Sequence, residues 1–152
     1  MTKFLSCMQN FWSARLMAAP SALLVTASAD AQARDVLKEA ADRKNWGIQF
    51  TNSCEEAWRI ANQFTAPVIL CDSDLPDTEW RESVRTLAAL PHRPIVILLS
   101  KVADEYLWNE VFRTGGFDIL AKPLRTQDIR RAVKLALSCW RSEATMTVKQ
   151  PA

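Results

Sequence analysis

The sequence has few of the residues that build nucleotide cradles or metal sites. Only three of its 152 residues are glycine, and neither a G-x-G-x-x-G motif nor a Walker-type loop occurs, which argues against a nucleotide-dependent enzyme. The four cysteines form no C-x-x-C pair and His92 is the lone histidine, so the usual ligand set of a structural zinc is missing. The composition therefore indicates no cofactor of these kinds.

A strong excess of charge and a long apolar run are also missing. Nineteen Lys and Arg against 17 Asp and Glu leave a formal charge of +2 without a basic block, so we expect no direct binding to nucleic acid. No apolar run approaches the roughly 18 residues of a membrane span. Asn10, Ser13 and Arg15 interrupt what would be the apolar region of an export signal. We expect a cytoplasmic protein with reduced thiols and no membrane contact.

What is present is the pattern of one globular α/β domain. From residue 21 onward, short apolar runs alternate with helical periodicity, which is typical of βαβ units. The expected strands are residues 22–26, 47–51, 68–71, 95–99 and 117–121. The sequence thus predicts a doubly wound, five-stranded, mainly parallel sheet over residues 21–140.

Capping residues mark where the helices should begin and end. Asp30, Ser53, Asp104 and Thr126 each precede a helical pattern, and Gly115 supplies a left-handed stop. The helix that follows Asp104 is predicted to face the core with four side chains, namely Leu107, Trp108, Val111 and Phe112.

Two segments flank this domain. Within residues 1–20, Leu5, Met8, Trp12 and Leu16 recur at helical spacing, so this N-terminal extension is compatible with an extra helix. Such a helix would pack on the domain or on a second copy of it in a homodimer. Residues 141–152 form a C-terminal tail that is too short for an output domain.

Three polar residues end three consecutive strands of the predicted sheet. Asp72 ends the third strand, Ser100 the fourth and Lys122 the fifth. Because functional groups of open parallel sheets collect at the carboxyl ends of strands, an acid, a hydroxyl and an amine should meet at one edge.

The runs around these residues resemble the receiver domain of bacterial two-component response regulators. They read Val-Ile-Leu-Cys-Asp72-Ser-Asp-Leu-Pro76, Ile-Val-Ile-Leu-Leu-Ser100 and Ile-Leu-Ala-Lys122-Pro123, separated by 28 and 22 residues. The resemblance covers about residues 22–140. It implies a flavodoxin-like (βα)5 fold and a signalling role instead of an enzymatic one. In such a domain Asp72 would take a phosphoryl group from a histidine kinase or phosphotransfer protein, with Ser100 and Lys122 binding the phosphoryl oxygens.

The chain departs from that family at two places: the positions that usually bind the metal ion, and the residue of the fifth strand that usually changes position when the domain switches state. Ala27 and Ser28 stand where receivers usually carry two acidic Mg²⁺ ligands, so no metal or other cofactor is expected. Asp30 is better explained as a helix cap. Ile119 replaces the aromatic residue or histidine that usually changes position on the fifth strand.

These departures favour a stand-alone, atypical receiver that binds proteins, with phosphorylation of Asp72 weakened or lost. The alternative is a conventional phosphoacceptor that takes phosphate on Asp72 despite its poor metal site. An unrelated small α/β enzyme would need a nucleophile–base pair or a cofactor loop, and the sequence has neither. The expected partner is a kinase, a phosphotransfer protein or a downstream effector. It would meet a surface on the fourth helix, fifth strand and fifth helix that includes Arg113, Asp118 and Arg130.

Overall fold

A computed structural model describes residues 22–149 of the chain, and the side chains of residues 22–144. The extension predicted at residues 1–20 lies outside the described residues. Over the described residues, five strands and five helices alternate: β1 Leu23–Ala27, α2 Ala31–Lys44, β2 Gly47–Thr51, α3 Cys54–Phe64, β3 Val68–Asp72, α4 Trp80–Ala88, β4 Ile95–Ser100, α5 Glu105–Thr114, β5 Asp118–Ala121 and α6 Thr126–Lys149.

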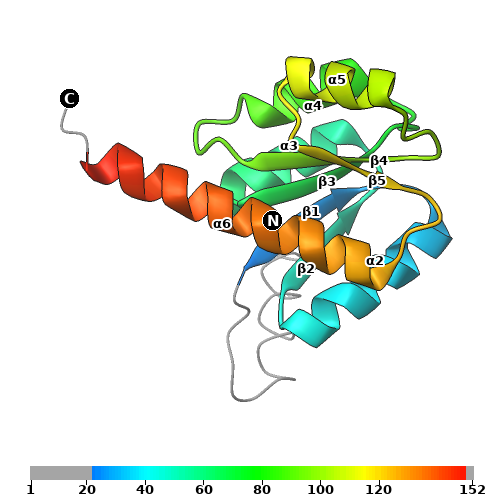
Figure 1. The fold of residues 1–152 in the computed structure, drawn as a ribbon, viewed down its shortest axis with the longest axis horizontal. Coiled ribbons are helices and arrows are strands. Elements are labelled where there is room, and N and C mark those ends of the chain that lie inside the picture. Colours follow the sequence, from blue (N-terminus) through cyan, green and yellow to red (C-terminus); the bar gives the residue numbers. More distant parts are fainter. Residues whose placement is uncertain (1–21, 150–152) are drawn as a thin grey trace.

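All five strands form one parallel sheet in the order β2-β1-β3-β4-β5. Helices α2 and α6 cover one face of the sheet, and α3, α4 and α5 cover the other (Figure 1). The order reverses between β1 and β3, so the carboxyl ends of these two strands flank the crevice where such sheets bind their ligands. The predicted doubly wound α/β fold is confirmed.

Two apolar layers hold the sheet between the helices. One cluster joins the sheet to α2 and α6, with Leu24 and Leu70 beneath Ile129 and Val133. The other joins it to α3, α4 and α5. The central strand β3 is buried at all five positions, and this explains why its sequence is continuously apolar up to Asp72.

Three of the four predicted N-terminal caps, Asp30, Ser53 and Asp104, are confirmed, whereas Thr126 is itself the first residue of α6. The carboxylate of Asp30 accepts hydrogen bonds from two backbone N–H groups of the first turn of α2, and Ser53 and Asp104 cap α3 and α5 in the same way. Gly115 ends α5 with φ at 107°, a left-handed conformation that favours glycine.

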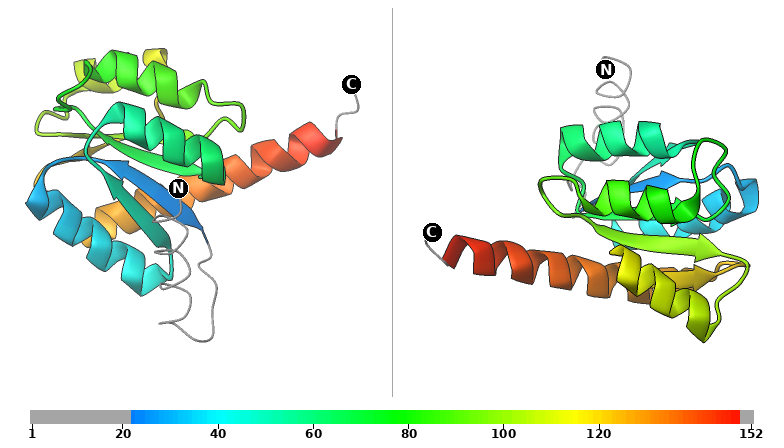
Figure 2. Two further views of the ribbon diagram at one scale, coloured as in Figure 1. Left: turned by 180° about the vertical axis from the view of Figure 1, so that it is seen from behind. Right: turned by 90° about the horizontal axis from the view of Figure 1, so that it is seen from above.

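Two predictions about the helices were wrong or incomplete. Trp108 and Phe112 do not face the core: they are 47% and 66% exposed, and only Val111 of the predicted four is fully buried. Helix α6 does not end near Trp140 but continues to Lys149, and its last turns extend beyond the sheet (Figure 2). Strand β1 is also shifted by one residue, because Ala27 instead of Ala22 belongs to it.

Candidate functional site

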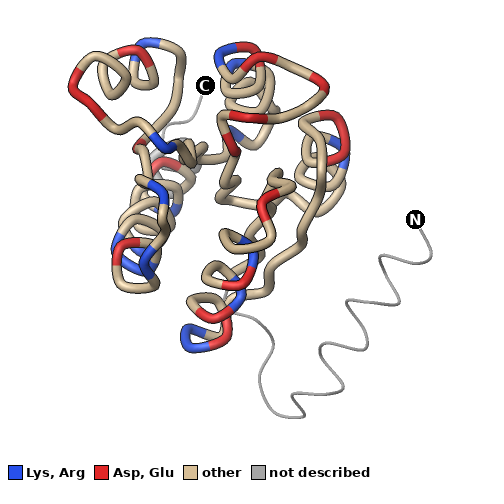
Figure 3. The backbone as a smooth tube through the Cα atoms, turned by 90° about the vertical axis from the view of Figure 1, so that its right-hand side faces the viewer, with Lys and Arg blue, Asp and Glu red and all other residues tan. Residues whose placement is uncertain are grey.

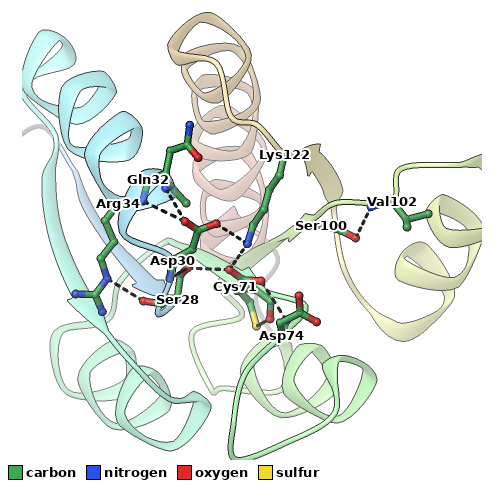
Figure 4. Close-up of polar contacts among 11 residues, drawn as sticks. Ser28, Asp30, Gln32, Arg34, Cys71, Asp74, Ser100, Val102 and Lys122 are labelled. Atoms are coloured by element: carbon green, nitrogen blue, oxygen red, sulfur yellow. Dashed lines mark hydrogen bonds and ion pairs between the residues drawn. The ribbon is translucent and has the colours of Figure 1, made fainter.

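The carboxyl edge of the sheet brings four polar side chains together. Asp72 is the last residue of β3, Ser28 and Asp30 follow β1, and Lys122 follows β5. Figure 4 shows the side chain of Lys122 directed toward Asp30 across this edge. The strand order explains why these side chains lie together. Strand β1 is the neighbour of β3 on one side, and β4 and then β5 follow on its other side.

The carboxylate of Asp72 is buried and held by three donors. Its Oδ2 atom accepts a hydrogen bond of 2.8 Å from the Ser28 hydroxyl and one of 2.6 Å from Lys122 Nζ. Its Oδ1 atom accepts the backbone N–H of Asp74 at 3.1 Å. The side chain is only 3% exposed, so these donors replace the water that an ionised carboxylate would otherwise need.

Lys122 bridges two carboxylates. Its ammonium lies 2.6 Å from Asp72 Oδ2 and 3.1 Å from Asp30 Oδ2, and its side chain is 10% exposed. Burial by itself lowers the pKa of Lys122, but the hydrogen bonds and charges of Asp72 and Asp30 outweigh burial and hold that pKa above its usual value. The hydrogen bond from Lys122 likewise lowers the pKa of Asp30. Lys122 is therefore fully charged at neutral pH.

Asp30 both caps α2 and binds Lys122, and the sequence indicated only the first of these roles. Its Oδ1 atom caps α2, while its Oδ2 atom binds Lys122. Its backbone N–H also donates to the Ser28 hydroxyl at 3.1 Å, so that hydroxyl accepts one hydrogen bond and donates another to Asp72. The contact with Lys122 depends on the tertiary arrangement, because it arises only once β1 lies beside β3 and Lys122 reaches across from the end of β5.

Ser100 reaches the same edge, but its hydroxyl points to its own loop. The hydroxyl accepts the backbone N–H of Val102 at 3.1 Å (Figure 4). Within the described side chains, no hydrogen bond joins it to Asp72 or to the ammonium of Lys122. The link to Lys122 runs through the backbone, where the N–H of Lys122 donates to the Ser100 carbonyl at 2.9 Å.

The two positions where receivers usually carry acidic metal ligands hold none in this chain. Ala27 is fully buried in the apolar cluster beneath α3, α4 and α5. Ser28 presents a neutral hydroxyl that is already bound to Asp72. No group of three or more Asp, Glu, His or Cys side chains capable of holding a metal ion occurs among the described residues. This donor set does not fit Mg²⁺, which favours carboxylate ligands and retains its waters.

Arg34 is a further residue that the sequence did not single out. Its Nε atom donates to the Ser28 carbonyl at 2.8 Å, its Nη2 atom donates to the Thr51 carbonyl at 3.2 Å, and the guanidinium also contacts Asn52. The ends of β1 and β2 are thus tied together, and this fixes the loop that carries Ser28.

A hollow of about 390 Å³ opens beside this network. Its walls include Asp30, Lys101 and Lys122 together with the Pro123–Leu124 segment. A group entering from solvent would therefore meet Lys122 and Asp30 before it reached the carboxylate of Asp72.

The residues expected to form the switch and the partner surface lie on three elements. Ile119 on β5 is partly buried against the cluster beneath α3, α4 and α5. Arg113 on α5 is exposed and lies 3.8 Å from Glu110. Asp118 accepts the N–H of Ile119 at 2.8 Å, and Arg130 on α6 is partly buried.

Comparison with known proteins supplies the family. The response regulator receiver domain matches residues 25–134, so the chain belongs to this family. Protein RcaC of Microchaete diplosiphon is 27% identical over 94 residues, which are 59% of this chain and 14% of that protein. The transcriptional regulatory protein SrrA of Staphylococcus aureus is 28% identical over 117 residues, which are 77% of this chain and 47% of that protein. The chain thus spans less than half the length of these relatives.

Solved structures agree on the fold. A putative response regulator from Chloroflexus aurantiacus has a TM-score of 0.70 at 21% identity and covers 77% of this chain and 98% of its own. The chemotaxis response regulator CheY4 of Vibrio cholerae has a TM-score of 0.69 at 14% identity, covering 76% and 98%. The chain is a receiver domain of two-component signalling, and receiver domains are signalling domains, generally not enzymes. None of the described helices is both long and apolar enough to cross a bilayer.

Proposed function

We propose that the chain is an atypical receiver that works by binding partner proteins in the cytoplasm, with phosphorylation of Asp72 weakened or lost. The observation that carries this proposal is the closed network around Asp72. Every oxygen of that carboxylate already has a donor, and the donor at the expected metal position is the Ser28 hydroxyl.

The lack of acidic side chains at positions 27 and 28 supports the proposal through the chemistry of phosphoryl transfer. An incoming phosphoryl group carries negative charge toward a carboxylate, so the site must supply positive charge to offset the repulsion. Here Lys122 is the cation beside Asp72, and it is shared with Asp30. The neutral Ser28 and the apolar Ala27 cannot bring in a second cation, so Mg²⁺ binding at this site is not part of the function that we propose.

The alternative is a conventional phosphoacceptor, and one observation favours it. Asp72 and Lys122, the two residues that the family resemblance makes central, lie in direct contact at 2.6 Å. A partner kinase or phosphotransfer protein could supply some of the missing electrostatic stabilisation when it docks.

Incubation with acetyl phosphate and Mg²⁺, followed by measurement of the intact mass, distinguishes the atypical receiver from the conventional phosphoacceptor. We expect little gain of one phosphate by the wild-type chain, and the same result for Asp72→Asn. A near-complete gain in the wild type that Asp72→Asn abolishes would overturn the leading proposal and promote the alternative. A receiver with an intact acidic pair, treated in parallel, shows that the phosphate donor is active.

The partner surface that we propose is formed by α5, β5 and α6. It contains Arg113, Asp118 and Arg130, whose charges can set the register of a partner while contributing little to folding. Ile119 has no ring or polar tip that could move between buried and exposed positions. We therefore expect the partner, whether a downstream effector or a phosphotransfer protein, to bind without regard to the state of Asp72.

A further inference from the structure

Helix α6 projects from the sheet at the edge opposite Asp72, where the strands begin. Its apolar side is buried as far as Leu137, which is 4% exposed. Trp140, about one turn further, is partly buried, and Ala144, another turn on, is exposed. From Trp140 the helix continues to Lys149, a length of about 14 Å (Figure 2). The buried stripe of α6 thus runs on beyond the sheet that covers its first part.

A hollow of about 360 Å³ lies where α6 leaves the sheet. Residues of α6, among them Trp140 and Ala144, line it together with the turn of Pro91, His92 and Arg93. The indole N–H of Trp140 donates to the His92 carbonyl at 3.0 Å, which fixes the ring against this turn. The lining is mainly apolar. An apolar hollow beside a tryptophan is suited to an apolar side chain.

The chain enters β1 close to this hollow. Strands β1 and β3 are paired in a register that sets Ala22 beside Ala66. The carbonyl of Ala66 lies 2.8 Å from Nε2 of His92, the residue whose own carbonyl binds Trp140. Ala22 also packs against the apolar cluster that joins the sheet to α2 and α6. The segment that precedes Ala22 therefore reaches the sheet at the edge from which α6 projects.

The sequence before β1 matches the projecting part of α6 in pattern and length. Leu5, Met8, Trp12 and Leu16 recur at the spacing of one helix face. From Leu5 to Leu16 that face would be about 17 Å long. The link between Leu16 and Ala22 can span at most about 20 Å, which is enough to bring Leu16 from the start of β1 to the hollow.

The hollow is too small to hold a second copy or an independent partner. Stable protein interfaces bury about 800 Å² on each partner and involve about 20–30 residues a side, whereas six residues line this hollow. Basic and acidic residues are interspersed along the described helices (Figure 3), so charge does not single out this edge for a partner. A segment of the same chain needs less contact, because its tether keeps it at a high local concentration.

We propose that residues 1–20 form an amphipathic helix that packs antiparallel along the projecting part of α6. Leu16 enters the hollow beside Trp140, and Trp12 lies one turn further out, against Ala144. The direction follows from the order of the chain, since Leu16 is the apolar residue of the stripe nearest to β1 and Trp140 is the one nearest to the sheet. This inference goes beyond the function proposed above and does not depend on it. A protein that approaches α6 beyond the sheet then meets a pair of helices instead of a single one.

Hydrogen–deuterium exchange of the full-length chain, followed by mass spectrometry, tests this packing from both sides. We expect the backbone amides of residues 141–149 to be protected in the wild type. The double variant Trp12→Ser/Leu16→Ser should raise their exchange rate by about tenfold or more, because the projecting turns of α6 lose their cover. Ala144→Glu places a charge in the proposed contact and should raise the exchange rate of residues 5–16 in the same way.

Each variant has a matched control away from the proposed contact. Phe11→Ser/Met17→Ser removes two apolar side chains that lie outside the predicted face of the extension, and it should leave the exchange of α6 unchanged. Ser142→Glu adds the same charge to α6 two residues from Ala144, about 200° around the helix, and should leave the exchange of the extension unchanged. Circular dichroism of each variant checks that the fold is retained.

Three results would overturn the inference. The first is exchange of residues 141–149 that is equally fast in the wild type and in Trp12→Ser/Leu16→Ser. The second is a control variant that changes the exchange rate as much as the variant it matches. The third is a dimer in sedimentation velocity that Trp12→Ser/Leu16→Ser disperses, because the extension would then pack on a second copy of the chain instead of on its own α6.

Discussion

Replacing Ser28 by aspartate should convert the site into one that responds to Mg²⁺, at a cost in stability. The Ser28 hydroxyl now lies 2.8 Å from Asp72 Oδ2 and donates to it. An aspartate there brings a second carboxylate next to the first, which is only 3% exposed. Two like charges about 4 Å apart repel by about 4 kcal/mol at an effective dielectric constant of about 20.

Lys122 moderates that repulsion without removing it. Its ammonium already serves Asp72 and Asp30, so one positive charge would face three carboxylates. We therefore expect the free energy of unfolding of Ser28→Asp, measured without metal, to fall by about 2–3 kcal/mol. Ser28→Asn is the matched control, because it adds a side chain of the same shape without the charge.

Magnesium should then restore part of the lost stability in the aspartate variant alone. With about 10 mM Mg²⁺ and a Kd of about 1 mM, binding to the folded state contributes about 1.4 kcal/mol. For a domain of this size that gain raises Tm by roughly 3–6 °C. Thermal unfolding followed by circular dichroism, with MgCl2 or with EDTA, measures both effects.

The Tm of the wild type and of Ser28→Asn should not rise when Mg²⁺ is added. The reasoning would be refuted if Mg²⁺ stabilised the wild type as much as Ser28→Asp, or if Ser28→Asp unfolded like the wild type and ignored the metal. The first result would mean that the present donors already hold the ion, and the second that the aspartate does not reach Asp72.

Three further results are expected from the same network and from the exposed rings. Lys122→Met should lower the free energy of unfolding in urea by about 3 kcal/mol, because it leaves the buried carboxylate of Asp72 without its cation; a change below about 0.5 kcal/mol would contradict the buried ion pair. The hydrogen bond from Lys122 lowers the pKa of Asp30 below 3.8, so the stability gained from that carboxylate is present above pH 3.8 and lost as the pH falls through the lowered value. The pKa of Lys122 is raised, so its contribution is present below pH 10.5 and lost as the pH rises through the raised value. The urea concentration at the midpoint of unfolding should therefore fall at acidic pH and again at alkaline pH. In Asp30→Asn, the fall at acidic pH should be smaller. Trp108→Ser/Phe112→Ser should change the free energy of unfolding by only about 0.5 kcal/mol or less per ring, since the rings are exposed.

The five strands, their doubly wound parallel arrangement and the main contact of the site could be predicted from the sequence because local signals agreed with the fold. Continuous apolar runs fit strands that are covered on both faces, and Asp30, Ser53 and Asp104 are caps that act within one helical turn. The parallel order of the sheet then places Asp72 and Lys122 at one edge, although 50 residues separate them.

The exposure of Trp108 and Phe112 could not be predicted because helical periodicity does not report how wide the buried stripe is. Leu107 and Val111 fall on the same helical spacing as the two rings. The four-residue strand β5 ends the sheet, so α5 has sheet beneath only one side of that broad stripe. A wide apolar stripe on a helix next to an edge strand is therefore a signal for an interface as much as for a core.

The roles of Ser28 and Asp30 depend on tertiary geometry that spacing alone does not reveal. A hydroxyl and a capping carboxylate after β1 have ordinary local explanations, and only the neighbouring β3 and the reach of Lys122 join them into one network. The continuation of α6 beyond Trp140 had a local signal, because residues 141–149 contain neither glycine nor proline.

The same geometry gives a physical reason to expect one stable state of the α5–β5–α6 face. A phosphorylation switch requires the ends of β4 and β5 to respond to a change at Asp72. Here the Ser100 hydroxyl is bound to Val102, the Lys122 ammonium is shared by two carboxylates, and Ile119 packs, partly buried, against the core. Each strand end therefore has its own internal anchor. A ligand shifts an equilibrium only by its differential affinity for two states. We therefore expect a face that is held by such anchors to bind its partner in the same way whether or not Asp72 is phosphorylated.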